Sequence, residues 1–202
     1  MKWDESKWQS VVWSDESTFS VTDSTHVNRV WRRPTDDRFS PKFTRKVVKH
    51  PASLMVWGCF SFHGTGALVF LERNVKMNQN NYLELLADHL PESFDKCKGD
   101  FFMQDGAPCH TAKQVKDWLR DCEVGFFEDW PGNSPDLNPI ENLWMSIKRQ
   151  LRNRDTSSLP KLRLAIQDIW DHFSPQELQN LASSVPRRLQ QVIARKGGMT
   201  KY

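Results

Sequence analysis

Two different residue periodicities alternate along the first 130 positions of this chain. Short runs rich in β-branched and aromatic residues, typical of strands, are separated by segments whose apolar residues recur every three or four positions, as in helices. The strand-like runs lie at residues 10–22, 54–62, 67–71, 100–104 and 124–127, and the helix-like segments at 78–90 and 111–120. The second and third runs are joined by a short glycine-containing segment, which is typical of a β-hairpin. This order predicts an α/β fold in which helices flank a mixed sheet.

The rest of the chain has a helical pattern. Helices are expected to begin near Asn138 and to cover residues 159–173, 175–183 and 186–196. Ser174 and Glu177 have the spacing of a capping box at the start of one of them. A length of 202 residues suits one domain, or one domain with an appendage. We therefore predict a core over residues 1–155 and a helical C-terminal extension over residues 156–202.

Positive charge is concentrated in two zones, although the net charge of the chain is only +3. Residues 29–50 carry eight Lys and Arg against two acidic residues, and residues 148–202 carry eleven against four. Three prolines between positions 32 and 51 predict a long irregular loop there. Basic zones beside an acidic remainder indicate a nucleic-acid partner, although each zone alone is equally compatible with a solvated face. The predicted DNA-contacting residues are Arg32, Arg33, Lys42, Arg45, Lys46, Lys148, Arg149 and Arg152.

Several classes of protein are excluded. The longest apolar run, residues 54–60, is far shorter than the roughly 18 residues of a membrane span. The four cysteines form no CxxC pair, which argues against a zinc site, and they are too few for a disulfide scaffold. No apolar signal segment follows the first residues. We therefore expect a cytosolic or nuclear globular protein.

Three carboxylates are the candidate catalytic residues. Asp15 lies inside the first strand, where its residue type is disfavoured. Asp105 ends a later strand, at the kind of sheet edge where α/β proteins bind ligands. Glu141 lies in the first turn of the helix that begins near Asn138. Oxygen ligands from separate elements suit Mg²⁺ or Mn²⁺, and three carboxylates can hold two such ions for phosphodiester displacement.

Each carboxylate also has a structural interpretation. Asp15 can point outward from a half-exposed strand, and Asp105 before a glycine is an ordinary turn signal. With Asn138 as N-cap and Pro139 as the first helical residue, Glu141 takes the position of a capping-box glutamate.

The apolar face of the Glu141 helix gives a further expectation. Trp144 and Ile147 are three positions apart and share one face of that helix. We expect both to be buried against the sheet, which would direct Glu141 across the sheet edge towards Asp15 and Asp105.

Three sequence motifs together resemble the Tc/mariner superfamily of DDE transposases. They are Trp-Ser-Asp-Glu-Ser-Thr-Phe at 13–19, Gln-Asp-Gly-Ala-Pro-Cys-His at 104–110, and Trp-Pro-Gly-Asn-Ser-Pro-Asp-Leu-Asn-Pro-Ile-Glu-Asn-Leu-Trp at 130–144. The resemblance covers essentially the whole chain. It implies a ribonuclease-H-like fold with Asp15, Asp105 and Glu141 as the metal-binding triad. Thirty-five residues separate the last two acids, where the commonest spacing in the family is 34.

The resemblance also implies roles for other residues. The basic segment 32–51 takes the place of a clamp-like insertion that contacts the partner subunit and DNA in relatives. His110 and Asn138 lie inside the motifs, and they are expected to position ligands or phosphate. His110 is equally well interpreted as a buried, hydrogen-bonded core histidine.

The implied activity is cut-and-paste transposition in the nucleus. A family member hydrolyses the phosphodiester at the element ends and joins the freed 3′-hydroxyl to a TA target, as a homodimer in the synaptic complex. Relatives also carry two N-terminal helix-turn-helix modules, whereas here the catalytic motifs begin almost at residue 1. The sequence is therefore compatible with an excised domain, a truncated copy or a domesticated gene product. The alternative functions are a DNA-binding or protein-interaction module without catalysis, and a general ribonuclease-H-like nuclease.

Overall fold

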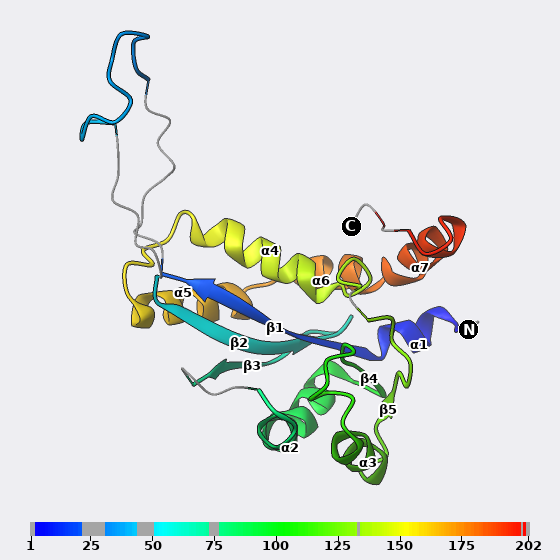
Figure 1. Cartoon of the computed structure of the whole chain (residues 1–202). Coiled ribbons are helices and arrows are strands. Elements are labelled where there is room, and N and C mark those ends of the chain that lie inside the picture. The colour runs from blue at the N-terminus through cyan, green and yellow to red at the C-terminus, as the bar shows by residue number, and fades with distance from the viewer. Residues whose placement is uncertain are drawn as a thin grey trace.

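The computed structural model describes residues 3–21, 31–43, 51–72, 77–132, 134–198 and 200. Two of the predicted DNA-contacting residues, Arg45 and Lys46, lie outside these ranges. The described residues form a five-stranded sheet with helices on both faces (Figure 1). The α/β class predicted from the alternating periodicities is confirmed.

The strands are β1 (Val11–Ser20), β2 (Ser53–Phe60), β3 (Thr65–Leu71), β4 (Phe101–Met103) and β5 (Gly125–Phe126). They lie in the order β3-β2-β1-β4-β5. Strand β2 is antiparallel to both β1 and β3, whereas β4 runs parallel to β1 and β5 runs parallel to β4. The sheet is therefore mixed, and β1 is its central strand. Residues at the start of β1 are buried whichever face they point to, which explains the continuous apolar run there.

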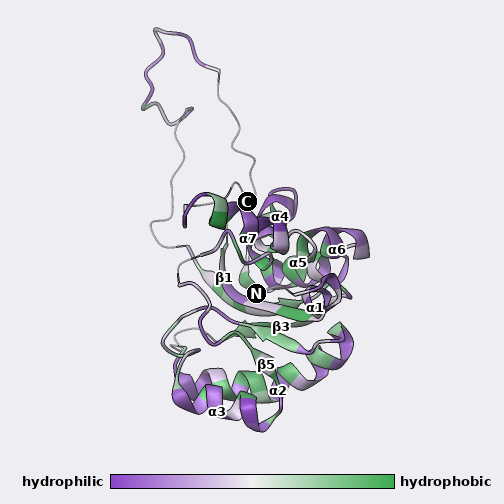
Figure 2. Cartoon of the chain, turned by 90° about the vertical axis from the view of Figure 1, so that its right-hand side faces the viewer, coloured by the Kyte–Doolittle hydropathy of each residue, from purple (hydrophilic) through white to green (hydrophobic). Residues whose placement is uncertain are grey.

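One face of the sheet is covered by α2 (Gln79–Cys97) and α3 (Lys113–Asp121). Their inward residues form a buried cluster with Val12 and Phe102 of the sheet, and the cluster includes Tyr82, Leu86 and Val115. Figure 2 shows these two helices below the sheet, with polar residues on the outer surface of α3. Helix α2 continues past Pro91 to Cys97, beyond the predicted end at residue 90, because its last turns also bury residues against the sheet.

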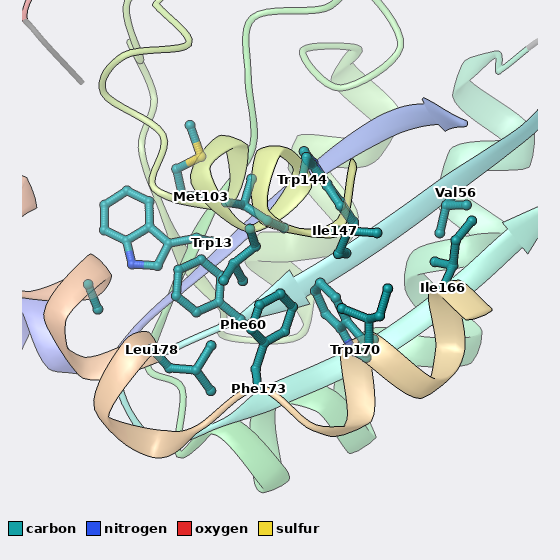
Figure 3. Close-up of a cluster of buried hydrophobic side chains, with 14 of the residues drawn as sticks. Trp13, Val56, Phe60, Met103, Trp144, Ile147, Ile166, Trp170, Phe173 and Leu178 are labelled. Atoms are coloured by element: carbon teal, nitrogen blue, oxygen red, sulfur yellow. The ribbon is translucent and has the colours of Figure 1, made fainter. Parts of the chain in front are cut away.

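The other face is covered by the later helices α4 (Ile140–Leu151), α5 (Leu159–Asp171), α6 (Pro175–Ala182) and α7 (Val185–Ala194), together with the short α1 (Glu5–Gln9). Their core is rich in large aromatic side chains (Figure 3). Trp144 of α4 stacks on Trp170 of α5, with ring centroids 5.4 Å apart. Trp144 and Ile147 are fully buried, as the sequence predicts.

The C-terminal helices are part of this core. Leu162, Ile166 and Trp170 of α5 lie in the same cluster as Trp13 of β1. The division of the chain after residue 155 stays a prediction. In the part of the chain that the structure describes, no helix combines the length and apolarity needed to span a lipid bilayer.

The predicted capping boxes at the starts of α6 and α4 have different outcomes. The capping box of Ser174 and Glu177 is present at α6. Helix α4, in contrast, begins at Ile140 with Pro139 as its N-cap. Asn138 Oδ1 accepts a bond from the Ile140 backbone N–H at 3.3 Å, but the Glu141 side chain accepts none from the Asn138 backbone N–H. The interpretation of Glu141 as a capping-box residue is therefore wrong. Helix α1 was not predicted, because a five-residue helix leaves too little periodicity to recognise; the Asp4 carboxylate caps it by accepting a bond from the Lys7 backbone N–H, 2.9 Å long.

Residues 31–43 form turns without strand or helix, in agreement with the predicted irregular loop. Figure 1 draws this segment away from the sheet. Trp31 is 93% exposed and Phe39 is 70% exposed. Aromatic side chains of this size are normally buried, so this segment presents an unusual combination of aromatic and basic residues to its surroundings.

Candidate active site

Strand pairing places Asp15 and Asp105 side by side. Strands β1 and β4 are parallel, and Trp13 pairs with Met103. Asp15 lies two residues further along β1, and Asp105 lies two residues beyond the last residue of β4. Glu141 reaches the same place from the first turn of α4. The three carboxylates line one cavity of about 280 Å³, together with Trp130, Pro131, Ser134, Pro135, Met103 and Asn138.

The alternation of side chains along β1 decides which layer each acidic residue faces. Trp13 belongs to the buried cluster between the sheet and α4, and Val12 belongs to the buried cluster between the sheet and α2. Asp15 therefore points to the α4 side, and Glu16 points to the α2 side. The carboxylates of Asp15 and Glu16 therefore lie on opposite faces of the sheet.

Asp15 is partly buried beside other negative charges. Burial raises its pKa, and the nearby charges of Glu141, Glu16 and Asp105 raise it further, to about 7. The indole Nε1 of Trp144 donates to Asp15 Oδ2 at 3.2 Å. This bond ties the direction of the carboxylate to the packed core of α4. The interpretation of Asp15 as an outward-pointing strand residue is therefore wrong.

Glu141 is also in an unfavourable environment for its charge. Burial raises its pKa, whereas Lys148 and the side chain of Asp15 act in the opposite direction. Lys148 lies two helical turns further along α4, on the same side of the helix as Glu141. Asp15 and Glu141 thus form a pair of close carboxylates with little positive charge to compensate them.

Asp105 has a different set of partners. Its Oδ1 lies 2.5 Å from His110 Nδ1 and also accepts a bond from the Ala107 backbone N–H at 2.9 Å. The hydrogen bond from His110 is the main cause that lowers the pKa of Asp105. The turn predicted from the glycine after Asp105 is present, but the carboxylate also lines the cavity.

His110 is held between two carboxylates. Its side chain is almost fully buried, with Nε2 lying 3.3 Å from Glu16 Oε1, an ion pair without hydrogen-bond alignment. Burial lowers the pKa of His110, but Asp105 and Glu16 outweigh it and raise the value to about 10. His110 is therefore protonated at neutral pH. His110 is therefore a buried core histidine that also contacts a candidate ligand, and its role in positioning ligands or phosphate stays a prediction.

The surroundings of His110 contain residues that sequence reasoning did not single out. The Tyr82 ring packs on the imidazole, with centroids 4.1 Å apart, and its hydroxyl donates to Gln104 Oε1 at 2.9 Å. Gln104 Nε2 in turn donates to the His110 carbonyl at 2.9 Å. Glu16 and Gln104 are the sequence neighbours of Asp15 and Asp105 inside the motifs. This position could have identified both as candidate site residues. Tyr82 gave no signal beyond its helical period.

Asn138 joins two of the elements that carry the acids. Its side-chain Nδ2 donates to the Ser14 carbonyl at 3.0 Å, and its Oδ1 accepts from the Ile140 backbone N–H at 3.3 Å. Ser14 Oγ donates to the Met103 carbonyl at 2.8 Å. Asn138 therefore joins the start of α4 to β1, and its expected role in positioning ligands or phosphate stays a prediction.

The site fits a hard divalent cation by its chemistry. Its three candidate ligands are carboxylates, and burial raises the pKa of both Asp15 and Glu141. The charges of Glu141, Glu16 and Asp105 raise that of Asp15 further, and a bound cation would relieve both effects. In the described ranges, no three His, Cys, Asp or Glu side chains are arranged so that they could hold a metal ion together. The role of the three acids as metal ligands stays a prediction.

The predicted DNA-contacting residues that the structure describes are all exposed: Arg32, Arg33, Lys42, Lys148, Arg149 and Arg152. The last three belong to or directly follow α4. Lys148 Nζ also lies 5.4 Å from the centre of the Phe19 ring on β1. Contact of these residues with DNA stays a prediction.

Comparisons with known proteins agree on one family. A family model described as "DDE superfamily endonuclease" matches residues 10–163. The Tcb2 transposase of Caenorhabditis briggsae is 36% identical over 205 residues, which cover all of this chain and 74% of the relative. The Tc1 transposase of Caenorhabditis elegans is 35% identical with the same coverage.

Solved structures show the same fold at lower identity. The catalytic domain of Mos1 mariner transposase matches with a TM-score of 0.75 and 17% identity, over 98% of this chain and 87% of that one. The Mos1 paired-end complex with the left transposon end matches with a TM-score of 0.81 and 19% identity, over 96% of this chain and 57% of the Mos1 chain. This chain thus spans little more than half of that transposase. The ribonuclease-H-like fold is confirmed, and the chain belongs to the DDE superfamily endonucleases, among the Tc1/mariner transposases.

Proposed function

We propose that this chain is the catalytic domain of a cut-and-paste DNA transposase. It would hydrolyse phosphodiester bonds at the ends of a mobile element and transfer the freed 3′-hydroxyl to a TA target. The observation that carries the proposal is the convergence of Asp15, Asp105 and Glu141 on one cavity, from β1, from the segment after β4 and from α4. The transposase relatives support the same activity.

The three acids would hold two Mg²⁺ ions, for which Mn²⁺ can substitute. When bound, such ions activate the attacking water or hydroxyl and stabilise the leaving oxygen. Mos1 paired-end complexes have been solved with Mn and with Mg, which supports this choice of cations.

The protein's own contribution is to position the acids. Trp144 fixes the direction of Asp15, His110 fixes Asp105, and Asn138 fixes the start of the Glu141 helix. These three positioning residues come from both sides of the sheet. The site is therefore largely preorganised, and little reorganisation is needed when a substrate binds.

DNA is the proposed partner. Lys148, Arg149 and Arg152 extend along α4 from the cavity, and residues 31–43 supply a second group of exposed cations. The Mos1 complexes contain transposon-end DNA, and their paired-end arrangement supports the proposal that two copies of this chain act together. An enzyme that acts on chromosomal elements would work in the nucleus.

Cleavage of supercoiled plasmid tests the proposal. We expect nicking or linearisation with Mg²⁺ or Mn²⁺ and none with EDTA. Asp105→Asn should abolish the cleavage while keeping the far-UV circular dichroism spectrum of the wild type. DNA binding without cleavage in either metal would instead favour a binding module that has lost catalysis. Cleavage of RNA–DNA hybrids but not of DNA duplexes would favour a general ribonuclease-H-like nuclease.

The salt dependence of DNA binding tests the basic residues separately. Neutralising Lys148, Arg149 and Arg152 should flatten the log–log slope of affinity against salt by about 0.9 for each phosphate that the protein no longer neutralises. The same measurement on Arg32, Arg33 and Lys42 reports on the 31–43 segment. An unchanged slope in either set would remove that set from the DNA interface.

A further inference from the structure

The last helix of the chain carries an arginine that is almost completely buried. Arg188 of α7 is 1% exposed. Burying a guanidinium is unfavourable unless its donors are satisfied, so a buried arginine indicates a specific set of acceptors. Figure 1 shows α7 in red beside the layer that carries α4.

Two acceptors of Arg188 lie on either side of Glu141 in the sequence. Arg188 Nη1 donates to the backbone carbonyl of Asp136 at 2.9 Å. Its Nη2 donates to Asn142 Oδ1 at 2.7 Å, and its Nε donates to Ser184 Oγ at 2.8 Å. One planar group thus connects the turn before α4 to the first turn of α4 itself. We call this set of bonds the Arg188 bridge.

The C-terminal segment adds a second contact to the same turn. The backbone N–H of Thr200 donates to Asp136 Oδ2 at 2.7 Å. Asp136 is buried and precedes Asn138, which lines the candidate active site. The turn before α4 is therefore held from the C-terminal side by α7 and by Thr200, and from the sheet side by Asn138.

Helix α4 needs such external support at its start. Its N-cap residue is Pro139, whose side chain cannot accept a hydrogen bond, and the first turn receives a long side-chain bond, from the Ile140 backbone N–H to Asn138 Oδ1 at 3.3 Å. The first turn of a helix has unpaired backbone N–H groups and frays easily without a cap. Glu141 lies in this first turn, so its position depends on whatever fixes the turn.

We propose that Arg188 is a positioning residue for catalysis, which holds Glu141 in place through Asp136 and Asn142. The helix α7 is then part of the catalytic machinery rather than an appendage. The family model ends at residue 163, before α7 begins, so the match itself assigns nothing to this arginine. The proposal rests on the proposed function only in its claim that Glu141 acts in cleavage.

The geometry predicts a specific requirement for arginine. Lysine keeps the positive charge but presents a single ammonium group, which cannot bridge the Asp136 carbonyl and the Asn142 carboxamide in one plane. Arg188→Lys should therefore fail to restore function, although it is the conservative replacement. Losses of about 10- to 100-fold are typical when a group that orients a metal ligand is removed.

Hydrogen–deuterium exchange reports directly on the position of the helix start. In Arg188→Lys, the amides of residues 137–143 should exchange at least about 10-fold faster than in wild type, whereas α2 and α3 should be unchanged. Arg187→Lys is the matched control, because Arg187 is the exposed neighbour in the same helix. Equal exchange of residues 137–143 in the two variants would overturn the proposal.

Activity and metal binding complete the test. Mg²⁺-dependent plasmid cleavage and Mn²⁺ affinity should both fall by about 10- to 100-fold in Arg188→Lys and remain at the wild-type level in Arg187→Lys. Asn142→Ala removes one acceptor of the bridge without placing a new charge in the core. It should show a smaller loss, and the double variant should lose no more than Arg188→Lys alone, because both changes break the same bond. Additive losses would contradict the bridge.

The outcomes separate this proposal from the proposed function. If Glu141→Gln abolishes cleavage while Arg188→Lys behaves as wild type, the transposase function stands and the positioning role is wrong. If Glu141→Gln retains wild-type cleavage and Mn²⁺ affinity, the proposed role of Glu141 fails. Exchange at residues 137–143 then still decides whether Arg188 fixes the first turn of α4.

Discussion

The two sides of the candidate active site treat their carboxylates in opposite ways. On the α4 side, Asp15 and Glu141 lie close together and burial raises the pKa of both. On the α2 side, Asp105 is paired with a protonated His110, which lowers its pKa. Among the described residues, no ion pair joins Asp15 or Glu141 to a cation, whereas on the other side one imidazolium is shared between Asp105 and Glu16.

The two sides therefore differ in their expected affinity for a cation and in how firmly each carboxylate is held before a cation binds. Uncompensated charge costs stability in the free protein but creates affinity for a cation. A carboxylate that is already paired contributes less to that affinity, but its position is fixed before any ligand arrives. We infer that Asp15 and Glu141 supply most of the electrostatic attraction for a cation. Asp105 supplies a ligand whose position is already fixed by His110.

The largest expected effect is the loss of cleavage when the uncompensated side is neutralised. Glu141→Gln should reduce Mg²⁺-dependent plasmid cleavage to background, because it removes a charged ligand and leaves the shape of the site unchanged. Its thermal midpoint should stay near that of wild type, since Glu141 does not cap α4. Differential scanning fluorimetry beside the cleavage assay checks both parts. Retained cleavage would exclude Glu141 as a ligand.

The next effect concerns the packing that supports the same side. Trp144→Ala should lower the free energy of unfolding by about 3–5 kcal/mol, as for other buried aromatic residues. It should also reduce cleavage, because the indole bond to Asp15 is removed. Chemical denaturation measures the first effect. Trp144→Phe serves as the control, since it keeps most of the packing but not the N–H; unaltered cleavage in this variant would show that the bond is unimportant.

Neutralising Asp15 should stabilise the metal-free protein. Because the folded pKa is raised from 3.8 to about 7, the folded state binds more protons than the unfolded state between these values, and wild-type stability falls as pH rises through this range. Asp15→Asn removes the cost, so its advantage should be absent near pH 4 and reach about 2–4 kcal/mol at pH 8. Urea denaturation with EDTA at both pH values measures it. A pH-independent difference, or a destabilised variant, would contradict the contrast between the two sides.

The smallest of these effects should come from the compensated side. His110→Gln keeps a polar side chain of similar reach but removes the positive charge between Asp105 and Glu16. We expect a loss of about 10- to 100-fold in metal affinity or cleavage, equivalent to about 1.4–2.7 kcal/mol. Titration with Mn²⁺ followed by calorimetry measures the affinity. Wild-type affinity in this variant would mean that Asp105 needs no histidine to hold its position.

Much of the fold follows from local sequence patterns. The order of strands and helices, the hairpin and the capping box at α6 were all predictable, because each depends on residues only a few positions apart. Trp144 and Ile147 were predictable for the same reason. The start of α4 near Asn138 was predictable as well, since the helix begins at Ile140. The bonds from Arg188 to Asp136 and Asn142 were not, because they join residues that are far apart in the sequence.

The sequence by itself determined which residues are available for chemistry. It identified the three carboxylates, the order of the elements that carry them and the apolar face that fixes the Glu141 helix. These are properties of short segments, where periods of two or of three to four residues are set by backbone geometry.

The tertiary structure alone decided how these carboxylates differ. The pairing of Glu16 with His110 and the contact of Arg188 with Asn142 join residues that are 94 and 46 positions apart. No local period specifies such contacts, because they arise when strands and helices pack and side chains compete for the same buried acceptors. The charge of each acid then depends on which partner the fold brings to it, and that is why three similar carboxylates are left in two different electrostatic states.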